Sequence, residues 1–411
     1  MNFRGVVPLK PNSEKIKMKY EELRNEIQNH PKYDGCVKID RSPLIHAGFP
    51  GNFNLSFTEY PWLQKFGRYI DFDRDYVFST VQSCIRPQDI PSTGTEDSWK
   101  YLGVFEMADL NGAIALKDKP NYEEVYKKQV FDFVNFLENH GISRERVYPS
   151  YCAGGSVKEL TRGKYNFDFQ IPEDSVSKES FLEAGIPETN LIKDRSRDTL
   201  LSLNLKQEGN LGKTILSYSP WGYRNEINIK MQDGKLLDVA TLERFEWNPI
   251  WAGEEIQNLG RINSGASILG VGLERFCMVV NNLQRVQDVD SIKPFYDEML
   301  KQTGGKNYLA GESLRALHRI YSDLIYFNIN DIRRHKKSNL ISTSQNIPLD
   351  LGKNRRSKIN KLTQNIPRDL DYSQINALLQ VHSETQLWHP EMKDGIEPTI
   401  ERIKIYRGER K

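Results

Sequence analysis

A period-two stretch in the middle of the chain constrains the fold more than any other feature of the sequence. Polar and apolar residues alternate over Glu226–Met231, Asp233-Gly234 is a turn signal, and a second strand pattern follows over Leu236–Ala240. Alternation buries one face of a sheet, and Asp-Gly is typical of a tight hairpin turn. We therefore expect an antiparallel sheet here, rather than the alternating strands and helices of a Rossmann domain.

Helical patterns lie on both sides of this stretch. Ser13 is a residue type that caps helices, and apolar residues recur at helical spacing over Ile16–Ile27 until Pro31. A second amphipathic stripe runs over Val125–Leu137, and the pattern after residue 280 is again helical. The sequence therefore predicts an α+β fold, in which helices flank the sheet and continue after it.

The segment Gly270–Arg275 reads Gly-Val-Gly-Leu-Glu-Arg. Glycine permits the close approach of a ligand to the backbone, and a guanidinium group is suited to phosphate and to aromatic faces. Alone, the pattern is weak, because a glycine-rich turn leading into a core helix is at least as common as a nucleotide site.

A second arginine-containing segment lies upstream. The β-rich run Tyr76–Arg86 enters a loop rich in Pro, Ser, Thr and Gly over Pro87–Thr95, and the chain returns over Tyr101–Met107. This pattern predicts an antiparallel hairpin in which Arg86 at the base of the loop could reach a phosphate while Phe105 faces a base. Taken alone, an ordinary hairpin with a surface arginine is the simpler interpretation.

Together, the two segments resemble motifs 2 and 3 of class II aminoacyl-tRNA synthetases, and the finer match is to alanyl-tRNA synthetases. Gln82–Arg86 resembles that family's Ser-Gln-x-Cys-Val-Arg, Phe105–Met107 repeats its Phe-Glu-Met, and Gly270–Arg275 resembles its Gly-Met-Gly-Leu-Glu-Arg. The order of the motifs also agrees. Weaker similarities at Asn54–Thr58 and Gly185–Glu188 extend the resemblance thinly over most of the chain.

The resemblance implies a fold and a division into domains. We expect a class II synthetase-like antiparallel β-sheet flanked by helices over residues 1–285. A smaller, helical, tRNA-binding-like domain would follow over residues 286–411, where Ser313–Arg315 resembles the start of the family's acceptor-binding domain. Members of the family commonly form dimers, so the resemblance leaves a homodimer as one possibility for this protein.

The activity implied by the resemblance is ATP-dependent activation of an amino acid or a related carboxylic acid as an adenylate. By resemblance, Arg86 would hold the α-phosphate and Arg275 the γ-phosphate, and both are the expected catalytic residues. Phe105 would enclose adenine together with Arg275. The full expected ATP site comprises Arg86, Phe105, Glu106, Met107, Gly270, Gly272 and Arg275.

Magnesium would bridge the ATP phosphates through carboxylate and water ligands. Asp238 and Glu226 are the expected metal ligands, and Asp238–Leu242 resembles the family's Glu-Ile-Trp-Asn-Leu. A single polar position on a half-exposed strand is an equally good interpretation of Asp238.

Departures from the family pattern fall where the amino acid would be recognised, at Ala240 and Ile268, which we assign to the amino-acid pocket. Ile268 stands where the family has an aspartate that anchors the substrate ammonium, and Ala240-Thr241 replaces its Trp-Asn. An unpaired ammonium in a pocket costs on the order of several kcal/mol, so alanine specificity does not follow. Lys100–Leu102 stands near a replaced histidine and arginine, and Gly209–Gly212 is a faint trace of a family glycine-rich segment.

Charge is distributed unevenly although the formal net charge is only +2. Cations gather at Arg333–Lys337 and Lys353–Lys358, and such clusters are usually solvated loops. With the resemblance, they predict contact with a tRNA acceptor stem. Ile347–Lys353 resembles the family's tRNA-contacting segment only loosely.

Cysteine spacing and hydropathy indicate which metal sites, disulfides and cellular locations to expect. The four cysteines are scattered, with no Cys-x-x-Cys pattern, so neither a zinc site nor a disulfide framework is indicated. No stretch approaches about 18 apolar residues, and the N-terminus has no long apolar core, so we expect no membrane association and a cytoplasmic location.

Three functions remain open from the sequence. The favoured one is a specialised adenylate-forming paralogue that passes an aminoacyl group to a non-tRNA or non-standard acceptor. The second is a compact alanine-tRNA ligase without the zinc-dependent editing domain, because the chain ends at Lys411 where family members continue. The third is a catalytically silent relative that binds tRNA, which the retention of both arginines disfavours.

Overall fold

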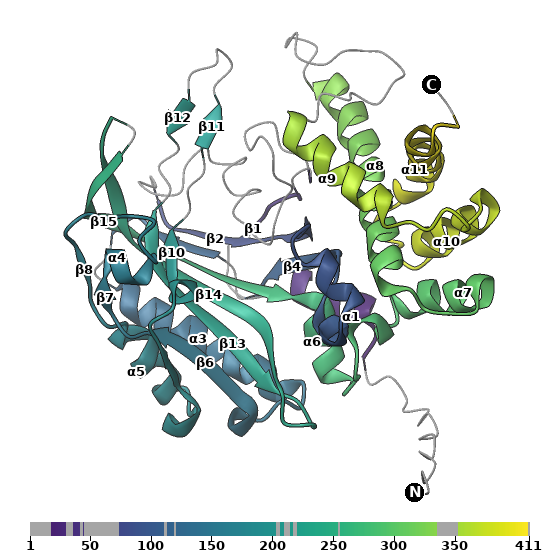
Figure 1. Cartoon of the computed structure of the whole chain (residues 1–411). Coiled ribbons are helices and arrows are strands. Elements are labelled where there is room, and N and C mark those ends of the chain that lie inside the picture. Colours follow the sequence, from purple (N-terminus) through teal and green to yellow (C-terminus); the bar gives the residue numbers. More distant parts are fainter. Residues whose placement is uncertain are drawn as a thin grey trace, which may run out of the picture.

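The computed structural model describes residues 18–29, 36–41, 44, 74–110, 113–118, 121–202, 206–208, 214–216, 220–253, 255–334 and 352–409. Figure 1 shows a large twisted sheet with helices packed against it and a group of helices at the C-terminal side. The α+β fold predicted from the sequence, with a sheet flanked by helices and a helical C-terminal region, is confirmed.

The main sheet is largely antiparallel and has the strand order β1-β2-β5-β15-β14-β13-β6-β9, with β3, β4 and β10 paired alongside this path. Only the β1–β2 and β6–β9 pairs of its described strands are parallel. The strands are β1 (Val37–Lys38), β2 (Tyr76–Ser79), β3 (Val81–Ile85), β4 (Val104–Asp109), β5 (Ala113–Leu116), β6 (Val147–Cys152), β9 (Ile192–Asp194), β10 (Leu200–Ser202), β13 (Trp221–Lys230), β14 (Leu236–Ala252) and β15 (Glu255–Gly272).

The predicted central hairpin is confirmed. β13 and β14 pair antiparallel across the turn, where Gly234 has the positive φ of 84° that favours glycine. A register shift between Ile227 and Asn228 marks a bulge beside the turn. Two smaller antiparallel pairs join β7 (Gly155–Ser156) to β8 (Gln170–Ile171), and β11 (Lys206–Glu208) to β12 (Thr214–Leu216).

Both predicted N-terminal helices are present where the chain is described. The first is α1 (Tyr20–Asn29), which buries Tyr20, Leu23 and Ile27, whereas Ser13, Ile16 and Pro31 lie outside the described residues. The second is α3 (Tyr122–Asn139). Shorter helices are η1 (Ile90–Gly94), η2 (Glu96–Lys100), η3 (Arg144–Arg146), α4 (Val157–Leu160), α5 (Ser175–Glu183), η4 (Glu188–Asn190), η5 (Arg197–Thr199), α6 (Leu273–Val280) and η6 (Val286–Asp288).

Helices α3 and α5 cover one face of the sheet. From α3, the Tyr122 hydroxyl donates to the Ala266 carbonyl at 2.6 Å, and the Tyr126 hydroxyl to Asn225 Oδ1 at 3.1 Å. A fully buried charge cluster lies at this interface: Arg244 pairs with Asp174 and with Glu246. Charged groups are rarely buried unless they are paired, so these three residues stabilise one another.

The C-terminal region is helical and packs directly on the sheet side. Leu314 and Leu317 of this region belong to the same apolar core as Leu102 and Val104, so the core continues across residue 285. The boundary between residues 285 and 286 therefore stays a prediction. Its helices are α7 (Lys293–Thr303), α8 (Tyr308–Arg334), α9 (Gly352–Gln364), α10 (Tyr372–Glu384) and α11 (Met392–Arg407).

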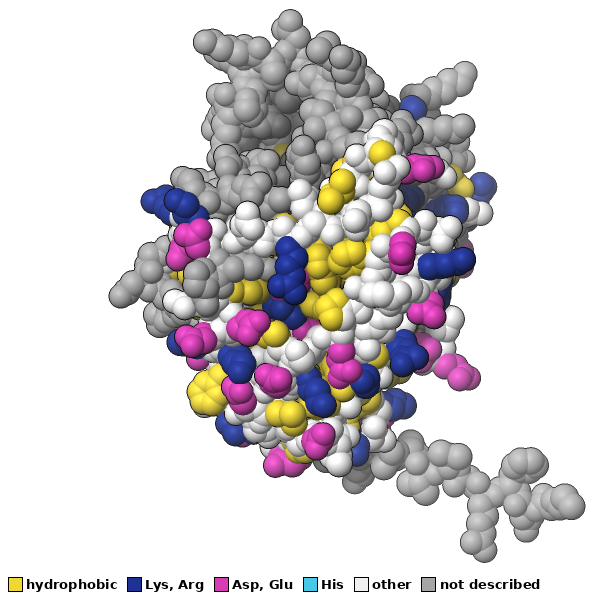
Figure 2. Space-filling model, turned by 90° about the vertical axis from the view of Figure 1, so that its left-hand side faces the viewer, with side chains coloured by type: hydrophobic (Ala, Val, Ile, Leu, Met, Phe, Trp, Pro, Cys, Tyr) yellow, Lys and Arg dark blue, Asp and Glu magenta, His cyan; other side chains and the backbone are white. Residues whose placement is uncertain are grey.

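The surface of the sheet side carries charges of both signs. Figure 2 shows Lys and Arg side chains interspersed with Asp and Glu on this face, rather than gathered by sign. Of the predicted basic clusters, Arg333 and Arg334 end α8 and Lys353–Lys358 lies in α9. Residues 335–337 are outside the described chain, as are Asn54–Thr58 and Gly209–Gly212. Within the described residues, no helix is both long and apolar enough to cross a membrane.

Candidate functional site

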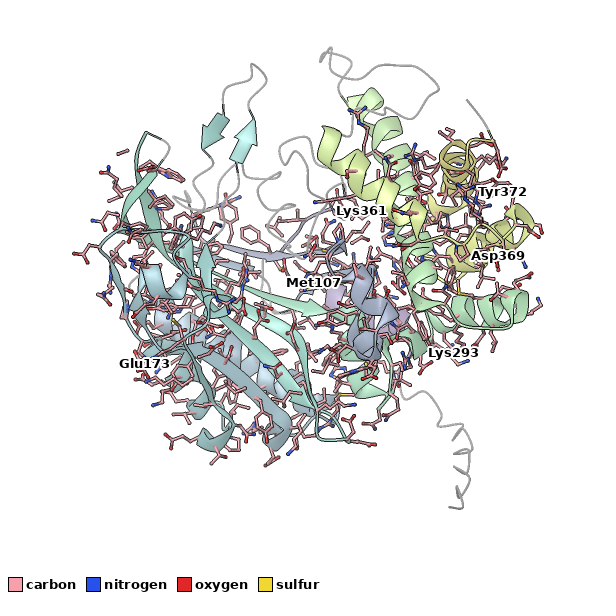
Figure 3. All side chains as sticks on the ribbon, in the orientation of Figure 1. Met107, Glu173, Lys293, Lys361, Asp369 and Tyr372 are labelled. Atoms are coloured by element: carbon pink, nitrogen blue, oxygen red, sulfur yellow. The ribbon has the colours of Figure 1, made fainter. Side chains whose placement is uncertain are left out.

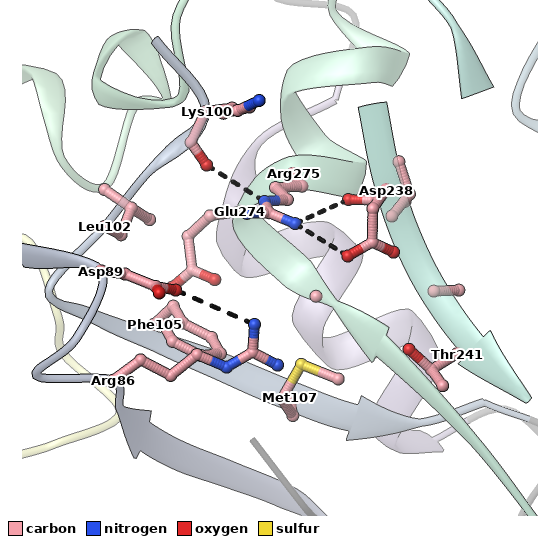
Figure 4. Close-up of a pocket in the computed structure, with 13 residues that line it drawn as sticks. Arg86, Asp89, Lys100, Leu102, Phe105, Met107, Asp238, Thr241, Glu274 and Arg275 are labelled. Carbon is pink, nitrogen blue, oxygen red and sulfur yellow. Dashed lines mark hydrogen bonds and ion pairs between the residues drawn. The ribbon is translucent and has the colours of Figure 1, made fainter. Parts of the chain in front are cut away.

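A pocket with an empty volume of about 490 Å³ opens beside β4, β14 and the start of α6. Figure 3 places Met107, one of its lining residues, between the sheet and the C-terminal helices. The pocket is lined by Arg86, Asp89, Lys100, Leu102, Phe105, Met107, Asp238, Val239, Ala240, Thr241, Gly272, Glu274 and Arg275. These residues come from segments that are far apart in the sequence, and Figure 4 shows how they converge.

The floor of the pocket is formed by β4 and the end of β15, which pair antiparallel. Phe105 and Met107 are two residues apart on β4, so their side chains lie on the same face of the sheet. A Cβ atom at Gly270 would lie 3.1 Å from Met107 Cε, and one at Gly272 would lie 3.8 Å from Met107 Sδ. The two glycines therefore leave the room that the methionine side chain occupies.

Arg275 is held at one side of the pocket by three hydrogen bonds. Its Nη1 donates to the Asp238 carbonyl at 2.9 Å and to Asp238 Oδ2 at 3.1 Å, and its Nε donates to the Lys100 carbonyl at 3.1 Å. These contacts use two of the three guanidinium nitrogens, Nη1 and Nε. They orient an arginine that follows directly from the start of α6.

Arg86 approaches from the other side of the pocket (Figure 4). Its guanidinium lies 5.5 Å from the centre of the Phe105 ring and 3.9 Å from Asp89 Oδ2. Burial raises the pKa of Asp89, while the nearby Arg86 and Arg275 act to lower it. Two guanidinium groups therefore act on one small volume, an arrangement suited to a polyanionic ligand.

Glu106 lies between two pocket residues, but its side chain points away from the pocket. Its carboxylate accepts from Arg24 Nε at 2.8 Å and from the Tyr20 hydroxyl at 3.0 Å. Its backbone N–H donates to both carboxylate oxygens of Glu274 at 3.0 Å. In this arrangement Glu106 supports the pocket wall from behind, whereas the sequence had placed it among the ATP-binding residues.

The two expected metal ligands lie on neighbouring strands beside the pocket. Asp238 lines it, and Glu226 accepts a hydrogen bond from Thr241 Oγ1 at 2.8 Å. Burial, and then the Asp238 carboxylate, raise the pKa of Glu226 to about 8. Among the described residues, no group of three or more His, Cys, Asp or Glu side chains is placed to hold a metal ion.

The raised pKa of Glu226 predicts a pH-dependent stability. The folded protein keeps this proton up to about pH 8, whereas the unfolded chain releases it near pH 4.5. Between these values the unfolded state binds fewer protons, so the free energy of unfolding falls as pH rises. Urea unfolding at about pH 5 and about pH 8 should therefore show a smaller loss of stability in Glu226→Gln than in the wild type.

Glu274 does not confound that comparison. Its pKa is also raised to about 8, by burial and then by Glu106, and it titrates in both proteins. Its contribution therefore cancels in the difference between them. An equal pH dependence in the variant and the wild type would contradict the assignment to Glu226.

The two residues assigned to the amino-acid pocket lie in different parts of the structure. Ala240 lines the pocket, whereas Ile268 is buried in a different apolar cluster that contains Phe78 and Phe245. Ile268 pairs across the sheet with Glu243, whose carboxylate accepts from Arg224 Nε at 2.8 Å. A carboxylate thus lies next to Ile268, although it already has an arginine partner.

The structure brings together most of the residues singled out in the sequence. Arg86, Phe105, Met107, Asp238, Ala240, Gly272 and Arg275 all line the pocket. Glu106, Glu226 and Gly270 lie beside it, whereas Ile268 lies in a separate apolar cluster. Sequence reasoning missed Asp89, although its position three residues after Arg86, in a loop of turn-forming residues, was an available signal.

Comparisons with known proteins point to one kind of relative. No family model matches the chain. It is 24% identical over 292 residues to an alanine–tRNA ligase of Elusimicrobium minutum, covering 69% of this chain and 30% of that protein. It is 24% identical over 315 residues to one of Borrelia hermsii, with coverages of 73% and 47%, and 22% identical over 192 residues to one of Candida albicans, with coverages of 46% and 18%.

The chain spans less than half the length of each of these curated relatives. Among solved structures, it resembles the RNA-binding domain of threonyl-tRNA synthetase from Cryptosporidium parvum, with 10% identity, 64% of this chain and 63% of that chain covered, and a TM-score of 0.36. A TM-score of this size does not establish a shared fold. The sequence comparisons support a distant, synthetase-like relationship.

Proposed function

We propose that this protein is an ATP-dependent ligase that activates an amino acid or a related carboxylic acid as its adenylate. The observation that carries the proposal is the convergence of Arg86 and Arg275 on one pocket beside Phe105. The distant similarity to alanine–tRNA ligases supports it. The proposed acceptor of the activated group is a specialised, non-tRNA one.

The reaction requires little covalent chemistry from the protein. An oxygen of the substrate carboxylate attacks the α-phosphorus of ATP, the bond to the bridging oxygen breaks, and pyrophosphate leaves. Arg86 and Arg275 would bind the phosphates and offset the negative charge that develops on their oxygens. Arg86 lies over the Phe105 ring in this structure, so adenine and this guanidinium compete for the same ring face.

Asp238 and Glu226 fit a magnesium ion in one respect. Magnesium is usually bound by one or two carboxylates, together with waters and substrate phosphates, and a pair beside a phosphate pocket meets that need. Burial, and then the Asp238 carboxylate, raise the pKa of Glu226, so this carboxyl would have to release its proton when a cation binds. Bound magnesium would supply charge neutralisation at the phosphates.

Two alternatives remain. A compact alanine–tRNA ligase without editing would charge tRNA, and a catalytically silent relative would bind tRNA without forming an adenylate. The similarity to alanine–tRNA ligases favours the first alternative. The absence of a carboxylate at Ile268, and its burial outside the pocket, favour a different substrate from alanine.

The test is ATP–pyrophosphate exchange on purified protein across the standard amino acids and simple carboxylic acids, with Arg86→Ala as the control. We expect one acid to support exchange, and the control to lose it. Exchange with none of them, together with no detectable ATP binding, would reject the proposal. The identity of the acid that supports exchange also shows whether the substrate carries an amino group.

Salt dependence separates a tRNA acceptor from the proposed small acceptor. A protein that contacts tRNA phosphates loses affinity steeply as salt rises, because bound counterions are released. We expect only weak tRNA binding by this protein, measured by filter binding at low and moderate salt. Tight binding with a steep salt slope would instead support the tRNA ligase.

A further inference from the structure

The connection between α10 and α11 brings a histidine from the helical region onto the sheet beside the pocket. His389 is 2% exposed, and its Nε2 lies 3.0 Å from Glu106 Oε1. Ser83 Oγ on β3 lies 3.3 Å from the same nitrogen. The imidazole therefore contacts the two strands that carry Arg86 and Phe105.

Glu106 is well placed to transmit this contact. Its neighbours Phe105 and Met107 line the pocket. On the opposite face of β4, the Glu106 carboxylate contacts Arg24 of α1 and His389. Its N–H donates to Glu274, which also lines the pocket. The position of the Glu106 backbone thus sets where three pocket side chains lie.

The other ring nitrogen of His389 faces the helical region. Its Nδ1 lies 3.5 Å from Glu391 Oε1, and that carboxylate accepts from Arg319 Nη1 of α8 at 2.8 Å and from Arg41 Nη2 at 2.6 Å. A continuous set of buried polar contacts therefore runs from α8 through the α10–α11 connection to β4.

The neighbouring residue makes a second contact with the same support. The Trp388 ring stacks on Tyr20 with centroids 5.2 Å apart, and the Arg24 guanidinium lies 5.4 Å from its centre. Tyr20 and Arg24 are the α1 residues that hold Glu106. Two consecutive residues of the connection therefore contact one cluster behind the pocket.

We infer that His389 is a positioning residue through which the docked C-terminal helices set the shape of the nucleotide pocket. The inference rests on the nucleotide-binding role proposed above. Without the imidazole, the buried Glu106 carboxylate loses a partner, and β4 is free to shift beneath Phe105 and Met107.

The test compares His389→Ala with His389→Gln and with a matched control, His382→Gln. His382 is also a buried imidazole of α10, but its ring contacts His318 at 3.0 Å rather than the sheet. We expect His389→Ala to raise the KM for ATP in the exchange assay by about ten-fold or more, with a smaller change in kcat. Glutamine, whose amide N–H can donate to Glu106, should restore most of the loss, and His382→Gln should leave the KM unchanged.

A second measurement keeps the inference testable without nucleotide. Hydrogen exchange of the peptide over residues 104–109 should speed up by about ten-fold or more in His389→Ala, recover in His389→Gln, and stay unchanged in His382→Gln. If His389→Ala does not fold, His389→Asn takes its place, because the shorter amide does not reach Glu106.

The outcomes separate this inference from the proposed function. If the wild type fails to bind ATP, the proposed function is wrong, and hydrogen exchange alone decides whether His389 positions β4. A folded His389→Ala protein with wild-type KM and wild-type exchange at residues 104–109 would overturn the inference. An equal effect of His382→Gln would overturn it as well, because it would show general loosening of the helices.

Discussion

Replacing Arg275 with alanine is expected to reduce ATP-dependent activity by about 10²- to 10³-fold, the usual loss when one group that stabilises developing charge is removed. The side chain is partly exposed and, among the described residues, hydrogen-bonds only to Asp238 and to the Lys100 carbonyl, so the fold should survive. The measurement is kcat/KM in ATP–pyrophosphate exchange with the active acid, alongside a thermal melt. The kcat/KM of Arg275→Lys should lie between those of the wild type and Arg275→Ala, because lysine keeps the charge but lacks the planar pair of donors.

Arg285→Ala is the matched control for this prediction. Arg285 also follows α6, but its guanidinium stacks on Tyr308 at 4.7 Å and contacts Ser98, away from the lining of the pocket. Its removal should leave exchange unchanged. Exchange by Arg275→Ala at the wild-type rate would mean that the pocket is not the site of activation.

The largest effect on stability is expected from Asp174→Ala. Asp174 is buried, pairs with the buried Arg244, accepts from Asn225 Nδ2 at 3.2 Å, and caps α5 through the Ser177 N–H. Burial lowers the pKa of Arg244, but Asp174 and Glu246 raise it by more. Because arginine is not deprotonated in proteins, the variant leaves a buried charge with Glu246 as its remaining acidic partner in this cluster. Breaking a buried pair from one side typically costs about 3–5 kcal/mol, which urea unfolding should detect.

Glu173→Ala is a close control, because Glu173 is the preceding residue and its ion pair with Lys193 is exposed. Exposed pairs contribute about 0–1 kcal/mol, so this variant should unfold at nearly the wild-type urea concentration. Equal midpoints for Asp174→Ala and Glu173→Ala would contradict the structural role assigned to the buried cluster.

Local patterns were sufficient to predict the elements on which the pocket is built. Alternation and an Asp-Gly turn predicted the β13–β14 hairpin, and helical spacing predicted α3 and the described part of α1. The two pocket arginines were singled out only when their segments were taken together, through the resemblance to two motifs of a synthetase family. These signals are short-range, so they can be read before the chain is folded.

The directions of individual side chains were harder to predict. Glu106 belongs to a recognisable Phe-Glu-Met sequence, yet alternation along β4 turns it away from the face that carries Phe105 and Met107. Ile268 was assigned to the substrate pocket, but the pairing of β15 with β14 places it in a separate apolar cluster. Each outcome depends on which face of the sheet the surrounding elements cover.

The sequence by itself determined the α+β class, the central hairpin and the two arginine-bearing segments, because periodicity, turn chemistry and residue type act over a few neighbouring residues. Only the tertiary structure decided which residues meet. The contact of Asp89 with Arg86 is local, but His389 reaches Glu106 across 283 residues and Asp174 reaches Arg244 across 70. Such contacts follow from strand register and helix docking, which depend on the whole core and leave no local pattern.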